Sequence, residues 1–446
     1  MEVDAVSHAT VFGLDPLWLS TAILILSYAS IMTERVNRAI VALVGAGVMI
    51  ISGVLDQKHA VAGIDFNTIA LLTGMMLLVA ISKRSGMFQY VAIWSAKVAR
   101  GSPWGMLALL TVVTAVASAL LDNVTTVLLM APVTLVITQQ LKVPPYPFLF
   151  TEILASNIGG TATLIGDPPN IIIGSATGLT FNDFALNLGP VVLIVLAVQI
   201  VINHLIWGRK MQVAEADRAR VLAFRPVEAI NDRPLLWKSL FVLALVIAGF
   251  ILAHSIHLEP GSIAMLGAAL LLLLENLGRS GEEQSHAVHQ TFSEVEWITI
   301  FFFVGLFVIV AGVEHAGLLA LLAAELIHLT GGDLTTTTLA ILWASAVLSA
   351  IIDNIPFVAT MIPVIKDMGT SFGGPQGLLP LWWALSLGAC LGGNGTLIGA
   401  SANLTVAGIG ERAGVPFRFV PFLLLAFPMM IVSILISTAY VYFRYL

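Results

Sequence analysis

The sequence predicts an all-α polytopic membrane protein with two inverted repeats of five transmembrane helices, each containing a re-entrant hairpin and a broken helix. Three observations lead to this fold class: the composition, the spacing of the apolar stretches and an internal repetition. Of the 446 residues, 58% are hydrophobic and only 10% are charged, whereas about a quarter of a soluble domain is charged. A bilayer core of about 30 Å takes around 20 mainly apolar residues per helical crossing. The chain therefore has room for about ten crossings and for no separate aqueous catalytic domain.

Apolar stretches follow one another along the chain in two similar sets. The first set covers residues 17–32, 39–55, 66–82, 107–121, 124–138, 148–157, 171–178 and 186–207. The second set covers residues 235–253, 261–274, 298–312, 337–352, 355–365, 380–391, 404–410 and 420–442. We interpret the pairs around Asp122 and Asp353, with arms of about 15 residues or fewer, as re-entrant hairpins. The pairs joined by the glycine-rich segments 159–169 and 392–402 are interpreted as single helices broken within the membrane.

The two sets repeat each other in sequence. The matches, in chain order, are Gly74 with Gly305, Gly86 with Gly317, Asp122 and Asn123 with Asp353 and Asn354, Pro132 with Pro363, and residues 159–170 with 392–403. The last pair of segments shares seven of twelve positions. We therefore predict two homologous halves, residues 10–207 and 235–446, joined by a cytoplasmic linker at 208–234. With five crossings each, the halves must have opposite orientations, which is the inverted-repeat plan of secondary transporters.

The basic residues predict the orientation. If the N-terminus lies outside, 17 of the 20 Lys and Arg residues fall in inner loops and only Lys58, Lys366 and Arg444 fall outside, as the positive-inside rule requires. We expect an integral protein of the cell (inner) membrane with both termini outside, although the acidic segment 275–296 fits the inner side poorly. Residues 1–16 contain no Lys or Arg and lack the basic region of a signal peptide, so the first apolar stretch is expected to remain as a membrane helix.

Several classes of function are disfavoured. A single cysteine, Cys390, excludes an intramolecular disulfide and a Cys-based metal cluster, and we predict no metal site and no cofactor. The slightly acidic balance argues against nucleic acid as a partner. Nucleotide-binding and hydrolase motifs are absent from the sequence, which argues against an enzyme. A soluble ATPase partner remains an open alternative, because such a subunit would leave no motif in this chain.

Aspartates at both hairpin tips are the candidate coupling groups. An aspartate within a membrane segment costs roughly 2.5–3.5 kcal/mol, so the repeated use of Asp122 and Asp353 suggests that they handle protons or ions. The alternative is that they only cap the following helices, where Asp is a favoured residue. Asp167 and Glu152 are possible further proton-coupling groups. Asp167 precedes Pro168 and has a helix cap as its alternative role, and Glu152 has Leu385 at its matching position.

Polar residues at the tips and breaks form the candidate substrate or ion site. Unwound glycine segments free backbone carbonyl groups that bind small cations, and neighbouring amides and hydroxyls add hydrogen-bonding groups. The candidate binding residues are Asp122, Asn123, Thr126, Asn157, Gly160, Thr161, Thr163, Asn170, Asp353, Asn354, Asn394, Thr396 and Asn403. Neither tip nor break contains Lys, Arg or His. A dicarboxylate would therefore meet two aspartates with no cation to offset them, at about 4 kcal/mol for one like-charge pair.

These segments resemble the signature segments of the ion transporter superfamily. Residues 122–126, 156–170 and 392–403 are similar to those of the branch that holds arsenite permeases, sodium–proton antiporters and the melanosomal P protein. The resemblance covers nearly the whole chain and implies a mobile transport domain that slides against a scaffold domain in an elevator-like motion. Sodium–dicarboxylate carriers of the superfamily have Ser-Asn-Thr at the tip, where this chain has Asp122, Asn123 and Val124. The added carboxylate argues against dicarboxylate transport.

The predicted function is secondary active transport of a small inorganic solute across the lipid bilayer, coupled to protons or Na⁺. The first hypothesis is proton-coupled efflux of arsenite or antimonite, because uncharged As(OH)₃ needs no counter-cation. The second hypothesis is a sodium–proton antiporter that uses the same carboxylates. Anion or dicarboxylate transport, and an ion-binding sensor or channel, rank below both.

Overall fold

The computed structural model describes residue 10, residues 13–33 and residues 35–446. Every regular element of this part of the chain is a helix, which confirms the predicted all-α fold. Eight helices are long and apolar enough to cross a membrane. They are α4, α6, α7, α10 with its π-helical extension, α12, α15, α17 and α21. The predicted location of the N-terminus falls on residues 1–9, which lie outside the described residues.

The helices follow the same order in the two predicted halves. The first half contains α1 (Pro16–Met32), α2 (Arg38–Ile51), α3 (Gln57–Ala62), α4 (Phe66–Lys83), α5 (Met87–Val98), α6 (Pro103–Leu120), α7 (Asn123–Leu141), α8 (Tyr146–Gly160), α9 (Pro168–Thr177) and α10 (Phe181–Asn203). The linker contains α11 (Glu215–Ala223). The second half contains α12 (Arg233–Ile256), α13 (Pro260–Asn276), α14 (Gly281–Ser293), α15 (Trp297–His315), α16 (Leu318–Leu329), α17 (Leu334–Ile351), α18 (Asn354–Asp367), α19 (Leu379–Gly392), α20 (Ser401–Arg412) and α21 (Phe419–Tyr445).

Three of the four hairpin arms are longer than predicted. Helices α6, α7 and α17 have 18, 19 and 18 residues, and only α18 has fewer than 15. Helices α6 and α17 begin earlier than predicted, after the N-caps Ser102 and Asp333, because a cap satisfies free N–H groups of the first helical turn. Helix α7 instead ends later than predicted, at Leu141, and includes Gln139 and Gln140.

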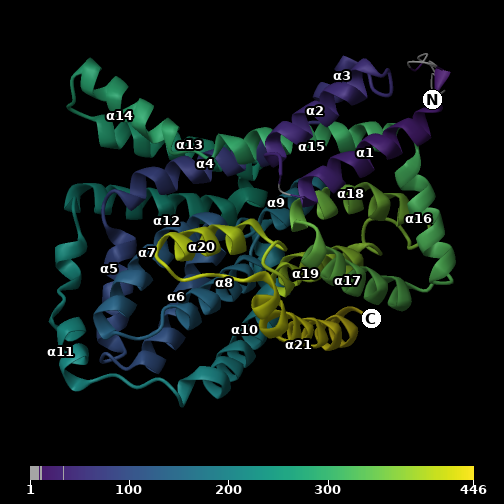
Figure 1. Ribbon diagram of the computed structural model, residues 1–446. Helices are drawn as coiled ribbons and strands as arrows, with labels where there is room; N and C mark the ends of the chain where they lie inside the picture. The colour runs from purple at the N-terminus through teal and green to yellow at the C-terminus, as the bar shows by residue number, and fades with distance from the viewer. Residues whose placement is uncertain (1–9, 11–12, 34) are drawn as a thin grey trace.

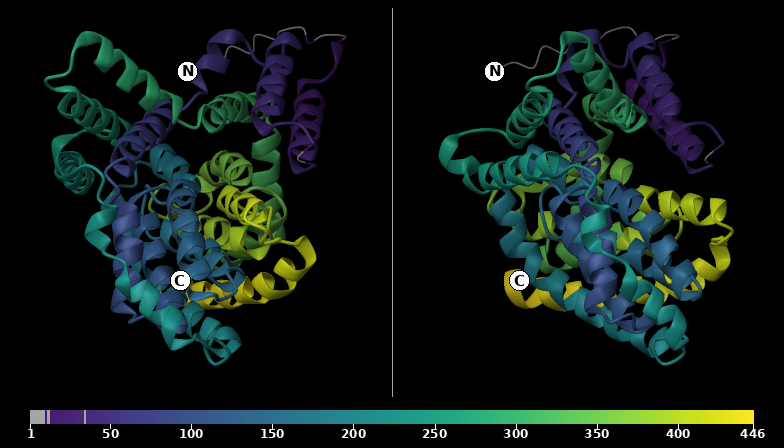
Figure 2. Two further views of the ribbon diagram at one scale, coloured as in Figure 1. Left: turned by 60° about the vertical axis from the view of Figure 1, so that its left-hand side comes forward. Right: turned by 90° about the vertical axis from the view of Figure 1, so that its left-hand side faces the viewer.

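Two groups of helices are visible in Figures 1 and 2. Helices α1, α2, α4, α12, α13 and α15 pack on one another and form what we call the outer group. Helices α6–α10 and α17–α21 form the tip group, which contains both hairpins and both breaks. Helices α5 and α16 lie at opposite ends of the molecule, with α11 and α14 on the side of α5 (Figure 1).

Matching glycines bring the outer helices together in the two halves. A methyl group added to Gly74 of α4 would lie 2.6 Å from the carbonyl carbon of Ala264 in α13, and one added to Gly305 of α15 would lie 2.5 Å from that of Ala42 in α2. Small residues allow such close approach of membrane helices. These paired contacts agree with two halves of similar fold, whereas their opposite orientation in a membrane and the domain boundaries stay predictions.

The helix breaks also match in their hydrogen bonds. The hydroxyl of Ser118 donates to the carbonyl oxygen of Ser156, and the hydroxyl of Ser349 donates to that of Ala389, both at 2.6 Å. In each half this bond ties the first arm of the hairpin to the helix that precedes the break. The tips and breaks are thereby held side by side at the centre of the tip group.

Candidate functional site

The first hairpin tip turns at Asp122, between α6 and α7. Its carboxylate accepts a hydrogen bond from the backbone N–H of Thr125 at 2.8 Å and another from the Thr125 hydroxyl. Asp122 is therefore an N-cap, as the alternative reading of the sequence predicted. Among the described residues, Asp122 takes part in no ion pair, so its negative charge stays without a cationic partner.

The second tip turns at Asp353, which bonds differently. The residue that matches Thr125 is Pro356, which has no N–H to donate. Asp353 accepts instead from the N–H of Ile355 through one oxygen at 3.2 Å. Its other oxygen accepts from the Ser401 hydroxyl at 3.0 Å and pairs with Arg38 at 3.1 Å.

The pairing with Arg38 overturns one expectation from the sequence. We expected no Lys or Arg close enough to offset the tip aspartates, because none occurs in the tips or breaks. Arg38 is the first residue of α2, 315 positions before Asp353, and helix packing brings the two together. Its guanidinium also donates to the hydroxyls of Ser401 at 2.5 Å and Thr299 at 3.1 Å.

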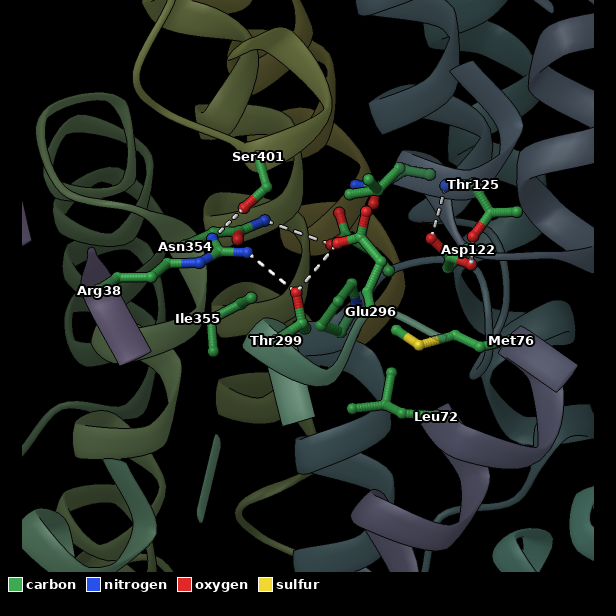
Figure 3. Close-up of a pocket in the computed structure, with 14 residues that line it drawn as sticks. Arg38, Leu72, Met76, Asp122, Thr125, Glu296, Thr299, Asn354, Ile355 and Ser401 are labelled. Atoms are coloured by element: carbon green, nitrogen blue, oxygen red, sulfur yellow. Dashed lines mark hydrogen bonds between the residues drawn. The ribbon is translucent and has the colours of Figure 1, made fainter. Parts of the chain in front are cut away.

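A small cavity lies between the two tips and the outer group (Figure 3). Its polar lining consists of Arg38, Asp122, Asn123, Thr125, Asp167, Glu296, Thr299, Asn354 and Ser401. In Figure 3, Arg38 approaches Ser401 and Thr299 on one side, Asp122 lies with Thr125 on the other, and Glu296 lies between them. Asp353 lines an adjoining cavity together with Arg38, Glu296 and Ser401. Carboxylates thus outnumber cations in this site.

The cavity is narrow and its acids are dispersed. Its volume of about 20 Å³ leaves room for about one water molecule. Within the described part of the chain, no three His, Cys, Asp or Glu side chains come close enough together to form a metal-binding cluster.

Side-chain amides connect the tips to the breaks. Asn123 donates to the side-chain oxygen of Asn157 at 3.1 Å. The amide nitrogen of Asn157 donates to the side-chain oxygens of Asn394 and Asn403, each at 2.9 Å. This amide network joins the first tip to both breaks through fully or almost fully buried residues.

The breaks are braced by a matching pair of asparagines. Asn170 donates to the carbonyl oxygens of Thr161 and Thr163 at 3.2 and 2.9 Å. Asn403 donates to the carbonyl oxygens of Gly393 and Thr396 at 2.8 Å each. The carbonyl groups freed by unwinding are therefore partly occupied by these amides.

The predicted site residues fall into two sets. Those that line the two cavities are Asp122, Asn123, Asn354 and Asp353. Those that lie behind them, in the amide network or the walls of the breaks, are Thr126, Asn157, Gly160, Thr161, Thr163, Asn170, Asn394, Thr396 and Asn403. The hydroxyls of Thr163 and Thr396 bond the carbonyl oxygens of Ala119 and Ala350 at the hairpins. Their direct contact with a solute stays a prediction.

The two further acids occupy different surroundings. Asp167 stands at the N-cap position of α9, before Pro168 as predicted, but its side chain makes no cap bond to the helix. It lines the cavity and accepts from the amide of Asn354 at 3.3 Å. Glu152 is fully buried and accepts from the hydroxyl of Thr134 away from the cavity.

Three polar lining residues from outside the predicted tips and breaks escaped the sequence prediction: Arg38, Glu296 and Thr299. All three lie at the start of an outer-group helix, Arg38 on α2 and the other two on α15. Arg38 was considered only as a charge that sets orientation. The available signal was that each is a polar residue at the edge of an apolar stretch, but such residues are common in membrane proteins.

A family model described as a citrate transporter (CitMHS) matches residues 28–388, which is more than half of the chain. The chain belongs to the citrate transporter family. It is therefore a membrane transporter, and the predicted likeness to the ion transporter superfamily is confirmed.

Relatives in sequence include other transporters, and two solved structures share the fold. An uncharacterized transporter of Mycobacterium tuberculosis is 45% identical over 432 residues, which cover 96% of this chain and 98% of that protein. The human P protein is 36% identical over 503 residues, which cover 95% of this chain and 59% of that protein. The crystal structure of the Alcanivorax borkumensis YdaH transporter, described as having an unusual topology, is similar with a TM-score of 0.63 and 15% identity over 96% of this chain and 98% of that one. Neisseria gonorrhoeae MtrF, from a class described as antimetabolite efflux pumps, has a TM-score of 0.57 at 12% identity, over 96% and 94% of the two chains.

Proposed function

We propose that this member of the citrate transporter family exchanges protons for Na⁺ across the membrane, with Asp122 and Asp353 as the coupling carboxylates. The observation that carries the proposal is the charge of the site. Asp122, Asp167 and Glu296 line the cavity, Asp353 adjoins it, and Arg38 is the one cation among the described lining residues. Such a surplus of carboxylates attracts cations and protons.

The same surplus disfavours anions. A carboxylate about 4 Å from another costs on the order of 4 kcal/mol at an effective dielectric of 20. Arg38 is the group that could receive a carboxylate of citrate, but it is already paired with Asp353 and bonded to Ser401 and Thr299. An anionic solute would have to break these contacts and leave Asp353 without its cation.

The size of the cavity between the tips also favours a small ion. Its room for about one water molecule suits Na⁺ better than a tricarboxylate, whereas the adjoining cavity at Asp353 is larger, at about 290 Å³. Carboxylate and amide oxygens from Asp122, Asn123 and Asn354 line this space. They are the kind of oxygen ligand that hard cations prefer.

Proton-coupled efflux of arsenite or antimonite is the second candidate. Hydroxyl and amide groups of Asn123, Thr299, Asn354 and Ser401 face the cavity, and they could bond the hydroxyls of a neutral As(OH)₃ molecule. A neutral solute gains nothing from the surplus of carboxylates, which is why Na⁺ comes first.

The test is an exchange assay in everted membrane vesicles with an imposed pH gradient. We expect Na⁺ to dissipate the gradient, with little effect of K⁺, citrate or succinate at neutral pH. Arsenite in place of Na⁺ distinguishes the second candidate. Vesicles without the protein and vesicles with Asp122→Asn are the controls. Saturable citrate uptake comparable to that of Na⁺ would overturn the proposal.

A further inference from the structure

Arg38 links the two helix groups of the molecule. It lies on α2 of the outer group, but its guanidinium binds Asp353 at the start of α18 and Ser401 at the start of α20, both in the tip group. The pair is not sealed from solvent, because the side chains of Arg38 and Asp353 are 25% and 13% exposed. It can therefore open without the cost of exposing a fully buried charge.

Arg38 also has contacts that would remain if Asp353 were released. Its second terminal nitrogen donates to Thr299 at 3.1 Å, and Thr299 in turn bonds the carboxylate of Glu296 at 3.3 Å. The guanidinium lies 5.1 Å from the centre of the Phe302 ring, within cation–π range. All three residues belong to α15 or its N-cap in the outer group, so Arg38 can stay with that group while the tip moves.

Among the described residues, the first tip has no equivalent cation. Gly305 packs on Ala42 of α2, and the matching Gly74 packs on Ala264 of α13, so Ala42 and Ala264 occupy equivalent positions in the two halves. The residue four positions before each is Arg38 in α2 and Pro260 in α13. Proline carries no charge, so only one of the two tips can be neutralised in this way.

We propose that Arg38 is a specificity-determining residue. Its guanidinium pairs with the carboxylate of Asp353 in place of a free cation, until the transported cation displaces it. The inference rests on the proposed Na⁺–proton exchange and concerns the same site. Arg38 and Na⁺ compete for one carboxylate oxygen, because both cannot bind it closely without repelling each other. An ion must therefore bind strongly enough to displace the arginine, and a neutral or anionic solute cannot do so.

Competition predicts a specific change in kinetics. In proteoliposomes, Arg38→Gln should lower the KM for Na⁺ by about fivefold, near the lower limit of typical coupling between sites. Arg38→Lys keeps the charge but loses the planar fork that binds Asp353, Ser401 and Thr299 together, so its KM should fall less. Arg35→Gln removes an exposed charge from the segment just before α2 and is the matched control with an unchanged KM. A merely structural role would lower kcat without lowering KM.

A binding measurement separates this inference from the proposed function. Na⁺ that binds the folded protein raises its Tm according to its affinity, whether or not transport occurs. The Na⁺ concentration for half of the maximal Tm shift, with choline as the reference cation, should be about fivefold lower in Arg38→Gln than in the unmodified protein. Equal concentrations in the two proteins, with exchange intact, would overturn the role of Arg38 alone. Absence of both exchange and a Na⁺-dependent Tm shift in the unmodified protein would overturn the proposed function and this inference together.

Discussion

Both hairpin tips place an aspartate at the N-cap of the second arm, but the two carboxylates have different partners. At the first tip, Asp122 directs both oxygens to Thr125 of its own helix. At the second, Asp353 directs one oxygen to its own helix and the other to Ser401 and Arg38. The difference begins with one residue. Pro356 stands at the position that matches Thr125, and a proline has no backbone N–H to donate to the aspartate.

This comparison separates what the repeat preserves from what it varies. The serine bonds to the breaks and the close glycine contacts occur in both halves, so the shape of the site is nearly symmetric. The charges are not, because Asp167 has Ala400 and Glu152 has Leu385 at the matching positions. We infer that the carboxylate of Asp122 at the first tip has no cationic partner among the described residues, whereas that of Asp353 at the second tip is paired with Arg38.

The largest expected effect is the loss of proton-driven exchange in Asp122→Asn and in Asp353→Asn. Each substitution removes a carboxylate that the proposed coupling requires, while an asparagine can still cap the helix. Exchange should fall to the level of empty vesicles, with normal amounts of membrane-inserted protein. Full pH-gradient-driven activity in both single variants would contradict the assignment. Activity lost only in Asp122→Asn would restrict proton coupling to the first tip.

The next effect concerns the shared backbone of the breaks. A methyl group added to Gly159 would lie 2.1 Å from the Ala115 carbonyl oxygen, and one added to Gly392 would lie 2.5 Å from that of Ala346. Overpacking of this kind costs about 1–3 kcal/mol or more. Gly159→Ala and Gly392→Ala should lower the Tm of the purified protein to a similar extent. Gly189→Ala on α10 is the control, because an added methyl group there meets no atom within 4 Å.

An intermediate effect tests the asymmetry of the amide network. Asn157 and Cys390 occupy matching positions, but Asn157 bonds three amide side chains, whereas Cys390 donates weakly to Asn170 at 3.5 Å. Asn157→Ala leaves several buried groups unpaired and should cost about 3 kcal/mol of unfolding free energy. Cys390→Ala should cost about 1 kcal/mol. Equal losses in thermal unfolding would mean that the network does not depend on Asn157.

The smallest effect probes the cap at the first tip. Thr125→Val removes the hydroxyl bond to Asp122 but keeps the backbone N–H bond, so it should cost about 1 kcal/mol. Thr125→Ser should restore most of the loss. The Tm of the two variants relative to the unmodified protein measures the difference. If Thr125→Val lowered the Tm as much as Asn157→Ala does, the Thr125 hydroxyl would contribute more to stability than a helix cap.

Much of the fold followed from local features of the sequence. The long apolar stretches predicted membrane helices because a bilayer demands them, and paired aspartates and glycine-rich segments predicted the tips and breaks because helices end where backbone groups need other partners. The helix lengths at the hairpins were underestimated, since the N-caps Ser102 and Asp333 lie several residues before the apolar stretches that the sequence marks.

The membrane helices, the tips, the breaks and the acidic character of the site were thus predictable from local sequence. The pairing of Arg38 with Asp353, the approach of Glu296 and Thr299 to the same cavity, and the bonds of Asn157 to Asn394 and Asn403 emerged only from the folded structure. Each of these contacts joins residues on different helices. Their side chains meet only after close packing of the helices has fixed which faces lie opposite one another, and no local pattern along the chain records that choice.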